Sequence, residues 1–153
     1  MILLFAMRLA VERRSEIGLR ELLAGLYLSS FERLQRYWPE WEQMEEFVVA
    51  ECGVSQPRFM YQMSVCEHLR ENSKEPMVGA TFDAEAGSVL QRASSLATAS
   101  GDRELRIEHL LLAISSTDQN DLCRRFTATG LNTDLVQEKM RRFRTRKGNR
   151  EQL

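Results

Sequence analysis

The chain has 153 residues, of which 43% are hydrophobic and 28% are charged, a composition that excludes a collagen-like or wholly disordered protein. Its net charge of −1 is unevenly spread: residues 139–150 hold seven basic and no acidic side chains, whereas residues 1–138 hold 14 basic and 21 acidic ones. A body with a net charge of −7 is not typical of a domain that binds nucleic acid through its own fold. The basic segment could contact phosphate or an acidic partner, or be a solvated terminus.

Apolar residues recur at intervals of three and four along most of the chain, which is the pattern of amphipathic helices. No segment shows the alternation that is typical of a β-strand. Gly53 is expected to end one helix, and Asn132 or Thr133 to cap the last one. The sequence therefore predicts an all-α fold with about eight helices. In chain order they cover roughly residues 2–14, 19–38, 39–52, 55–70, 82–100, 107–116, 121–128 and 133–140.

The helices fall into two sets of four that resemble each other. Residues 72–81 contain Ser, Pro and Gly without periodicity, and we interpret them as a linker between the sets. Residues 17–26 (IGLRELLAGL) align without a gap with residues 105–114 (LRIEHLLLAI), and later ECGVS at 51–55 corresponds to ATGLN at 128–132. Two copies of a helical unit that cannot bury its apolar face alone are expected to pack against each other.

The second set resembles the repeat of the Clp N-terminal domain, which lies at the front of Clp/Hsp100 AAA+ unfoldases. Phe82, Ala86, the stretch IEHLLLAI at 107–114, and Gly130 with Leu131 carry this resemblance. The first set matches more loosely and begins partway through the first helix of the family. The resemblance implies an all-α domain of two four-helix repeats related by a pseudo-twofold axis.

On this basis the chain divides into a Clp N-terminal-like domain and a tail. The domain covers residues 1–140, with repeat one at 1–71, the linker at 72–81 and repeat two at 82–140, and residues 141–153 form a basic flexible tail. The resemblance implies a non-catalytic module that recruits substrate or adaptor proteins to an AAA+ chaperone or protease. Its expected partners are an AAA+ unfoldase, an adaptor or a client protein.

In some members of the family each repeat also binds arginine-phosphorylated proteins through an acidic residue at the start of its second helix. Glu108 occupies that position here, whereas Arg20 occupies it in repeat one and reverses the charge. The family's Gly and Thr before the acid are replaced by Arg106 and Ile107. These substitutions argue against phosphoarginine binding. From its position alone, Glu108 either contacts a ligand or caps the helix.

Three aromatic residues are further candidates for partner contact. His109 begins the apolar run of its helix, so it is either a partner contact or a buried, hydrogen-bonded histidine. Trp38 and Trp41 lie in an aromatic-rich insertion at residues 31–44. This insertion either forms a binding surface or covers the interface between the repeats.

The sequence contains no enzyme signature, since a phosphate-binding loop, G-x-S-x-G and H-E-x-x-H are all absent. Cys66 and His68 supply only two of the four ligands that a zinc site needs, so we expect no metal and no cofactor. Three cysteines without regular spacing are typical of reduced thiols.

The apolar start of the chain is too short for a signal peptide, and no apolar run approaches the length of a membrane span. We therefore expect a cytoplasmic protein without membrane contact. The alternative hypothesis is a helical regulatory protein that contacts nucleic acid through the basic C-terminal tail, although the acidic body makes nucleic acid the less favoured partner.

Overall fold

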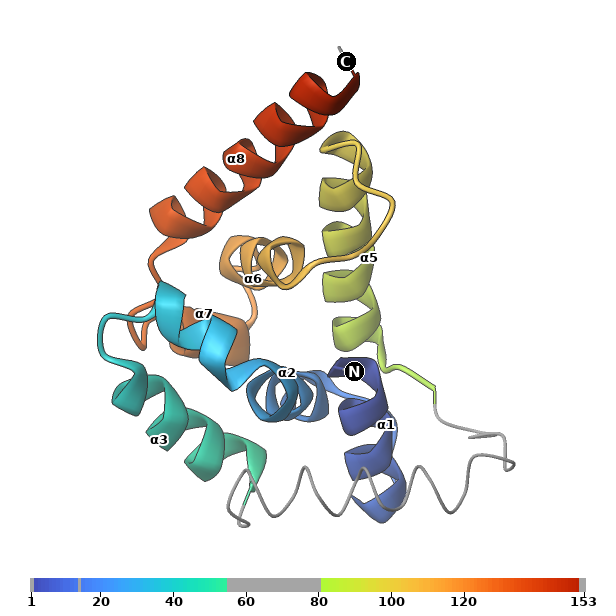
Figure 1. Cartoon of the computed structure of the whole chain (residues 1–153). Helices are drawn as coiled ribbons and strands as arrows, with labels where there is room; N and C mark the ends of the chain where they lie inside the picture. The colour runs from blue at the N-terminus through green and yellow to red at the C-terminus, as the bar shows by residue number, and fades with distance from the viewer. Residues whose placement is uncertain (1, 14, 55–80, 152–153) are drawn as a thin grey trace.

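The computed structural model describes residues 2–13, 15–54 and 81–151 (Figure 1). In this part of the chain the fold is all-helical, with seven α-helices and one short 3-10 helix, so the predicted fold class is confirmed. The helix expected at 55–70 and nearly all of the expected linker lie outside the described residues. The elements are α1 (Ile2–Arg13), α2 (Leu19–Leu34), η1 (Gln35–Tyr37), α3 (Trp41–Cys52), α5 (Ala84–Ala99), α6 (Ile107–Ser116), α7 (Asp121–Thr127) and α8 (Thr133–Glu151).

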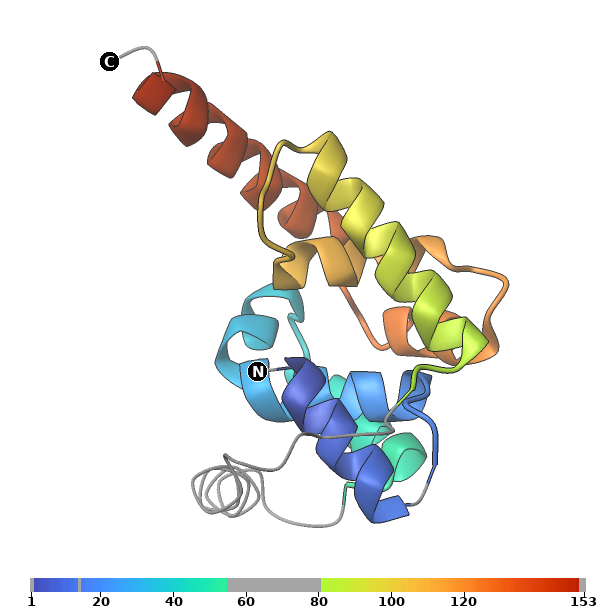
Figure 2. The same ribbon diagram turned by 90° about the vertical axis from the view of Figure 1, so that its right-hand side faces the viewer.

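The helices pack in two corresponding groups. In the first group α2 contacts both α1 and α3, and in the second α6 contacts α5, α7 and α8. The groups meet where α2 touches α5, α3 touches α7 and η1 touches α8. Figures 1 and 2 show α2 and α6 between the other helices, with α8 extending away from the body of the domain.

The N-termini of α2 and α6 share one capping arrangement. Both helices begin one residue after the aligned pair Gly18 and Arg106. In α2 the backbone N–H of Gly18 donates to the Glu21 carboxylate at 3.0 Å, and in α6 that of Arg106 donates to Nδ1 of His109 at 3.0 Å. The third residue of each helix thus caps the helix start, in the manner of a capping box. The positions that the ungapped alignment pairs thus both precede a helix and are capped in the same way.

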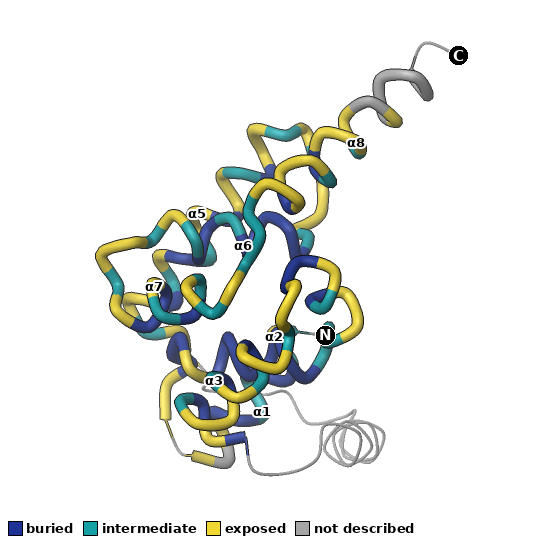
Figure 3. Tube along the Cα trace, turned by 90° about the vertical axis from the view of Figure 1, so that its left-hand side faces the viewer, coloured by how far each residue is buried: buried dark blue, intermediate teal, exposed yellow. Residues whose placement is uncertain are grey.

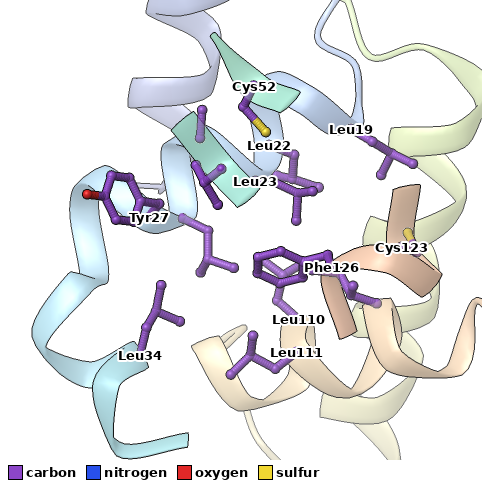
Figure 4. Close-up of a cluster of buried hydrophobic side chains, with 14 of the residues drawn as sticks. Leu19, Leu22, Leu23, Tyr27, Leu34, Cys52, Leu110, Leu111, Cys123 and Phe126 are labelled. Carbon is purple, nitrogen blue, oxygen red and sulfur yellow. The ribbon is translucent and has the colours of Figure 1, made fainter. Parts of the chain in front are cut away.

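The core is shared by both repeats. One continuous cluster of buried side chains includes Leu22 and Leu23 of α2, Leu110 and Leu111 of α6, and Phe126 of α7, all at most 2% exposed. Figure 4 shows these side chains meeting between the two groups of helices, and Figure 3 shows buried segments of α2 and α6 facing the interior. Because both repeats contribute side chains to this one cluster, the burial of apolar surface holds the two together.

Repeat one is closely packed between its first two helices. A Cβ atom at Gly25 of α2 would lie 2.6 Å from the carbonyl oxygen of Ile2 and 3.0 Å from the backbone nitrogen of Ala6. Only glycine allows α1 to approach α2 this closely. The aligned position in α6 is Ala113, so the packing on α5 needs no such approach.

The end of α2 bends toward the second repeat. Ser30 leaves helical geometry, with φ −133° and ψ 22°, and the last turn of α2 then continues into η1. A pair of adjacent serines is a common site of such a bend, since their hydroxyls compete for backbone groups. Here the Ser29 hydroxyl donates to the carbonyl oxygen of Leu26 at 3.5 Å. The bend brings η1 to the second repeat, where the N–H of Asn132 donates to the Tyr37 carbonyl at 2.8 Å.

A short backbone contact joins the chain at the start of repeat two to repeat one. The N–H of Ile17 donates to the Thr81 carbonyl at 2.8 Å, and the N–H of Asp83 donates to the Ile17 carbonyl at 3.0 Å. The Asp83 side chain then accepts from the N–H of Ala86 at 2.8 Å and caps α5. This isolated parallel bridge between Ile17 and Phe82 fixes the start of α5 beside the loop that precedes α2.

Two of the predicted helix boundaries are confirmed, and one differs. Gly53 ends α3 with a φ of 67°, a left-handed conformation that favours glycine. The Asn132 side chain caps α8 by accepting from the N–H of Leu135 at 3.2 Å. Helix α3 begins at Trp41, so Pro39 precedes this helix instead of lying in its first turn.

The basic segment expected to be a flexible tail from residue 141 is part of a helix. Helix α8 continues to Glu151, because Arg and Lys are good helix formers and no proline follows Met140. Arg142 pairs with Glu138 one turn earlier at 2.7 Å, and Arg144 donates to the Ser100 hydroxyl at 2.9 Å. Apolar periodicity, on which the sequence prediction relied, cannot detect a helix made of charged residues. No helix in the described ranges has the length and apolar character that a membrane span requires.

The substitution Leu111→Ala tests the shared core. Leu111 is fully buried, so its truncation should lower the free energy of unfolding by about 2–5 kcal/mol through lost transfer energy and cavity formation. Leu135→Ala is the matched control, because Leu135 is 40% exposed and its truncation should change stability by about 0.5 kcal/mol or less. Urea unfolding measures both. Equal effects of the two substitutions would show that Leu111 is not a core residue.

Candidate functional site: a groove between the repeats

A groove of about 750 Å³ opens where α8 and both repeats meet. It is bordered by the start of α1, the end of α2 with η1, the middle of α5, the start of α6 and the second turn of α8 onward. Its lining residues are Ile2, Leu3, Ser30, Arg33, Arg36, Tyr37, Leu90, Glu104, Leu105, Arg106, Ile107, Glu108, Leu110, Lys139 and Phe143. Since the groove draws on both repeats, it exists only when they are packed together.

Part of the groove surface is apolar and open to solvent. Leu3 of α1 is 39% exposed and Leu105, just before α6, is 42% exposed. Phe143 of α8 adds an aromatic ring that is half-buried. Large apolar side chains that are exposed together in a concave site are typical of a surface that binds another molecule.

The charged side chains of the groove are mainly basic. Arg33, Arg36, Arg106 and Lys139 line it, against the acidic Glu104 and Glu108. The Arg106 guanidinium lies 4.2 Å from the centre of the Phe143 ring and 3.9 Å from the Asp102 carboxylate. The Lys139 ammonium lies 5.4 Å from the centre of the same ring. These contacts hold two of the cations beside the aromatic ring.

Glu108 is tied to the other repeat. Its side chain is only 9% exposed, and the Tyr37 hydroxyl donates to its Oε1 at 2.7 Å. Burial, and then this hydrogen bond to the Glu108 carboxylate, raise the pKa of Tyr37 well above its usual value, so the phenol remains a donor. Of the two roles left open by the sequence, capping belongs to the neighbouring His109, and the Glu108 carboxylate lies in the wall of the groove.

His109 is fully buried and faces the protein interior. Its Nδ1 accepts from the N–H of Arg106, and its Nε2 lies 3.1 Å from Oδ2 of Asp102. Because Nδ1 is an acceptor, Nε2 carries the proton and donates to Asp102. Both ring nitrogens are therefore used in holding the start of α6. Of a partner contact and a buried, hydrogen-bonded histidine, the structure shows the latter.

The aromatic insertion covers the interface between the repeats. Trp38 is 1% exposed, its ring lies 5.3 Å from that of Phe126, and its Nε1 donates to the Thr129 hydroxyl at 2.9 Å. Trp41 is half-buried and packs edge-on against Phe31, with the ring centres 5.4 Å apart. Neither residue lines the groove. The structure thus places Trp38 in the core, and it places Trp41 away from the candidate site.

The sequence indicated Glu108 but not the residues around it. Tyr37, Arg33 and Arg36 come from the end of the bent α2 and from η1, about 70 residues earlier in the chain. No motif spacing connects them with α6. Their proximity results from the bend at Ser30 and the packing of the two repeats.

The two described cysteines have the properties of core residues. Cys52 and Cys123 are free thiols at 1% and 0% exposure. Burial raises the pKa of Cys52 to about 12 and that of Cys123 to about 11. Thiolate is therefore scarce at neutral pH, which argues against a catalytic role for these two thiols. Cys66 and His68 lie outside the described residues, and the described ones contain no group of three His, Cys, Asp or Glu that could hold a metal ion.

Comparison with known families supports the same assignment. The model of the Clp repeat N-terminal domain matches residues 47–147, well over half of the chain, so the protein belongs to this family. Clp repeat N-terminal domains are non-catalytic. The match begins within α3, so α1 and α2 lie before the matched residues. No curated protein and no solved structure matches the chain.

The hydrogen bond between Tyr37 and Glu108 should stabilise the packing of the repeats. Tyr37→Phe leaves a buried carboxylate without its donor, and it should lower the free energy of unfolding by about 1–3 kcal/mol. In a double-mutant cycle with Glu108→Ala, which removes the acceptor, urea unfolding should give a coupling energy of about 0.5–3 kcal/mol. Additive effects of the two substitutions would contradict a direct interaction.

The buried thiols should resist alkylation. In a Cys66→Ser background at about pH 8, a thiol whose pKa is about 11 carries roughly one thiolate per thousand molecules, and reagent access is also blocked. Iodoacetamide should therefore label Cys52 and Cys123 only after unfolding in urea, as measured by mass spectrometry. Labelling of the native protein as fast as of the unfolded protein would contradict the burial of these thiols.

Proposed function

We propose that this protein is a non-catalytic recruitment module, which binds client or adaptor proteins and brings them to an AAA+ unfoldase. The observation that carries the proposal is the groove between the repeats, in a chain that belongs to the Clp repeat N-terminal family. The groove combines exposed Leu3 and Leu105 with charged side chains, so it can hold a polypeptide segment by apolar and polar contacts.

The recruiting unit is the domain of residues 1–140, with the basic end of α8 beside it. The groove needs both repeats, because Arg33, Arg36 and Tyr37 come from one and Glu108 and Leu105 from the other. The reduced state of Cys52 and Cys123 is consistent with work in the cytoplasm. The AAA+ partner is either a separate chain or a further part of the same polypeptide.

The alternative function is contact with nucleic acid through the basic part of α8. Some of its cations are engaged within the domain: Arg142 pairs with Glu138, and Arg144 donates to the Ser100 hydroxyl. Fewer cations then remain for phosphate, whose neutralisation drives such binding. Protein recruitment is therefore the better supported function.

Binding of a permanently unfolded client tests the proposal. The probe is fluorescently labelled serum albumin that has been reduced and alkylated with iodoacetamide, and fluorescence anisotropy measures its affinity for the whole chain. Leu105→Ser removes an apolar contact from the groove and should weaken binding about tenfold, equivalent to about 1.4 kcal/mol. Leu105 lies in the loop before α6, so the domain should remain folded.

Val49→Ser is the matched control, because Val49 is 45% exposed on α3 and does not line the groove. This variant should bind the client as the unchanged protein does. Equal affinities of the two variants, or no binding of the client to the unchanged protein, would contradict recruitment through the groove. Tight binding of duplex DNA that is lost when residues 141–153 are deleted would favour the alternative.

A further inference from the structure

We propose that the groove selects acidic segments, in which Asp or Glu residues alternate with apolar ones. The inference rests on the proposed function and specifies the chemistry of the client or adaptor segment that is bound. The charge of the groove relative to the rest of the domain is the observation that leads to it.

Three cations of the groove are available to a ligand. Arg33 and Arg36 lie one turn apart at the end of α2 and in η1, and both are exposed. Lys139 reaches the groove from α8. The structure gives none of the three an ion pair within the described residues. Their charges are therefore not compensated by a carboxylate of the domain in direct contact.

The two acidic side chains of the groove do little to offset the charge of these cations. Glu108 as a residue is 9% exposed and its carboxylate accepts the Tyr37 hydroxyl, so this acid is largely covered. Arg33 and Arg36 line the same groove as this carboxylate. Only Glu104 is an exposed acid among the lining residues. These three cations would repel the guanidinium group of a ligand, whereas they would attract a carboxylate.

The acidic character of the rest of the chain strengthens the preference of the groove for acidic segments. Residues 1–138 carry 14 basic and 21 acidic side chains, yet the groove has four basic and two acidic ones. A basic site on an acidic body attracts an acidic segment to that site and repels it elsewhere. Complementary charge therefore both directs the segment to the groove and fixes its position there.

The apolar part of the groove adds a second requirement. Exposed Leu3 and Leu105 and the ring of Phe143 lie beside the cations. Cations held over an aromatic ring remain close to apolar surface. A segment that is only acidic would leave this surface uncovered, so an alternation of acidic and apolar residues fits best.

Three labelled peptides of about 12 residues test the charge preference. They share the same Leu and Phe residues and differ only in the residues between them, which are Glu, Gln or Lys. In anisotropy titrations with the whole chain, the Glu peptide should bind about tenfold tighter than the Gln peptide, and the Lys peptide should bind most weakly. Raising salt from about 50 to about 300 mM should weaken the Glu peptide most.

Substitutions identify the cations that are responsible for the preference for the Glu peptide. The double variant Arg33→Gln, Arg36→Gln should weaken the Glu peptide about fivefold or more and leave the affinity of the Gln peptide unchanged. Arg124→Gln is the matched control, because Arg124 is an exposed cation of α7 that does not line the groove, and it should change neither affinity. Circular dichroism checks that each variant is folded.

Three outcomes overturn the preference in distinguishable ways. If the Glu and Gln peptides bind equally and Leu105→Ser weakens both, the groove recruits polypeptides without regard to acidity, and the proposed function remains. If Leu105→Ser affects no peptide, the groove is not the site and the proposed function fails with it. Competition by duplex DNA that depends on Arg33 and Arg36 would also overturn the inference, since the cations would then serve a phosphate ligand.

Discussion

The two repeats are held together by one buried cluster of apolar side chains, to which each repeat contributes a row of leucines. Leu22 and Leu23 of α2 and Leu110 and Leu111 of α6 belong to one buried cluster. The burial of these apolar faces is the term that holds the domain together, because neither repeat can hide its own row from water. The capping of α2 and α6, the bend in α2 and the position of α8 all contribute to this contact.

The same closure produces the functional surface. The bend at Ser30 brings η1 to the second repeat, where Tyr37 donates to Glu108 and Trp38 packs on Phe126. The cations carried by the end of α2 and η1 then face α8 across the groove. Glu108 is thereby covered by Tyr37 and shares the groove with four cations. The insertion at residues 31–44 thus supplies two of the four cations that line the groove, Arg33 and Arg36.

Sequence periodicity predicted the all-α fold, and the ungapped alignment paired the starts of α2 and α6, because both depend on local apolar spacing and capping. It missed the continuation of α8, whose charged residues form a helix without an apolar stripe. It left the roles of Glu108, His109 and Trp38 open, since burial depends on which helices meet. The partner of Glu108 could not be found from sequence: Tyr37 is distant in the chain and is brought near only by a bend and by tertiary packing.

Native-state hydrogen exchange tests most directly whether the repeats form one cooperative unit. The account predicts that the slowest amides of α2 and α6, such as those of Leu23 and Leu111, exchange with the same opening free energy, equal to that of global unfolding. Each would then be exposed only when both repeats separate. If the amides of one repeat exchanged through an opening that costs about 2 kcal/mol less than global unfolding, the repeats would be independent and the shared core would not be the basis of the fold.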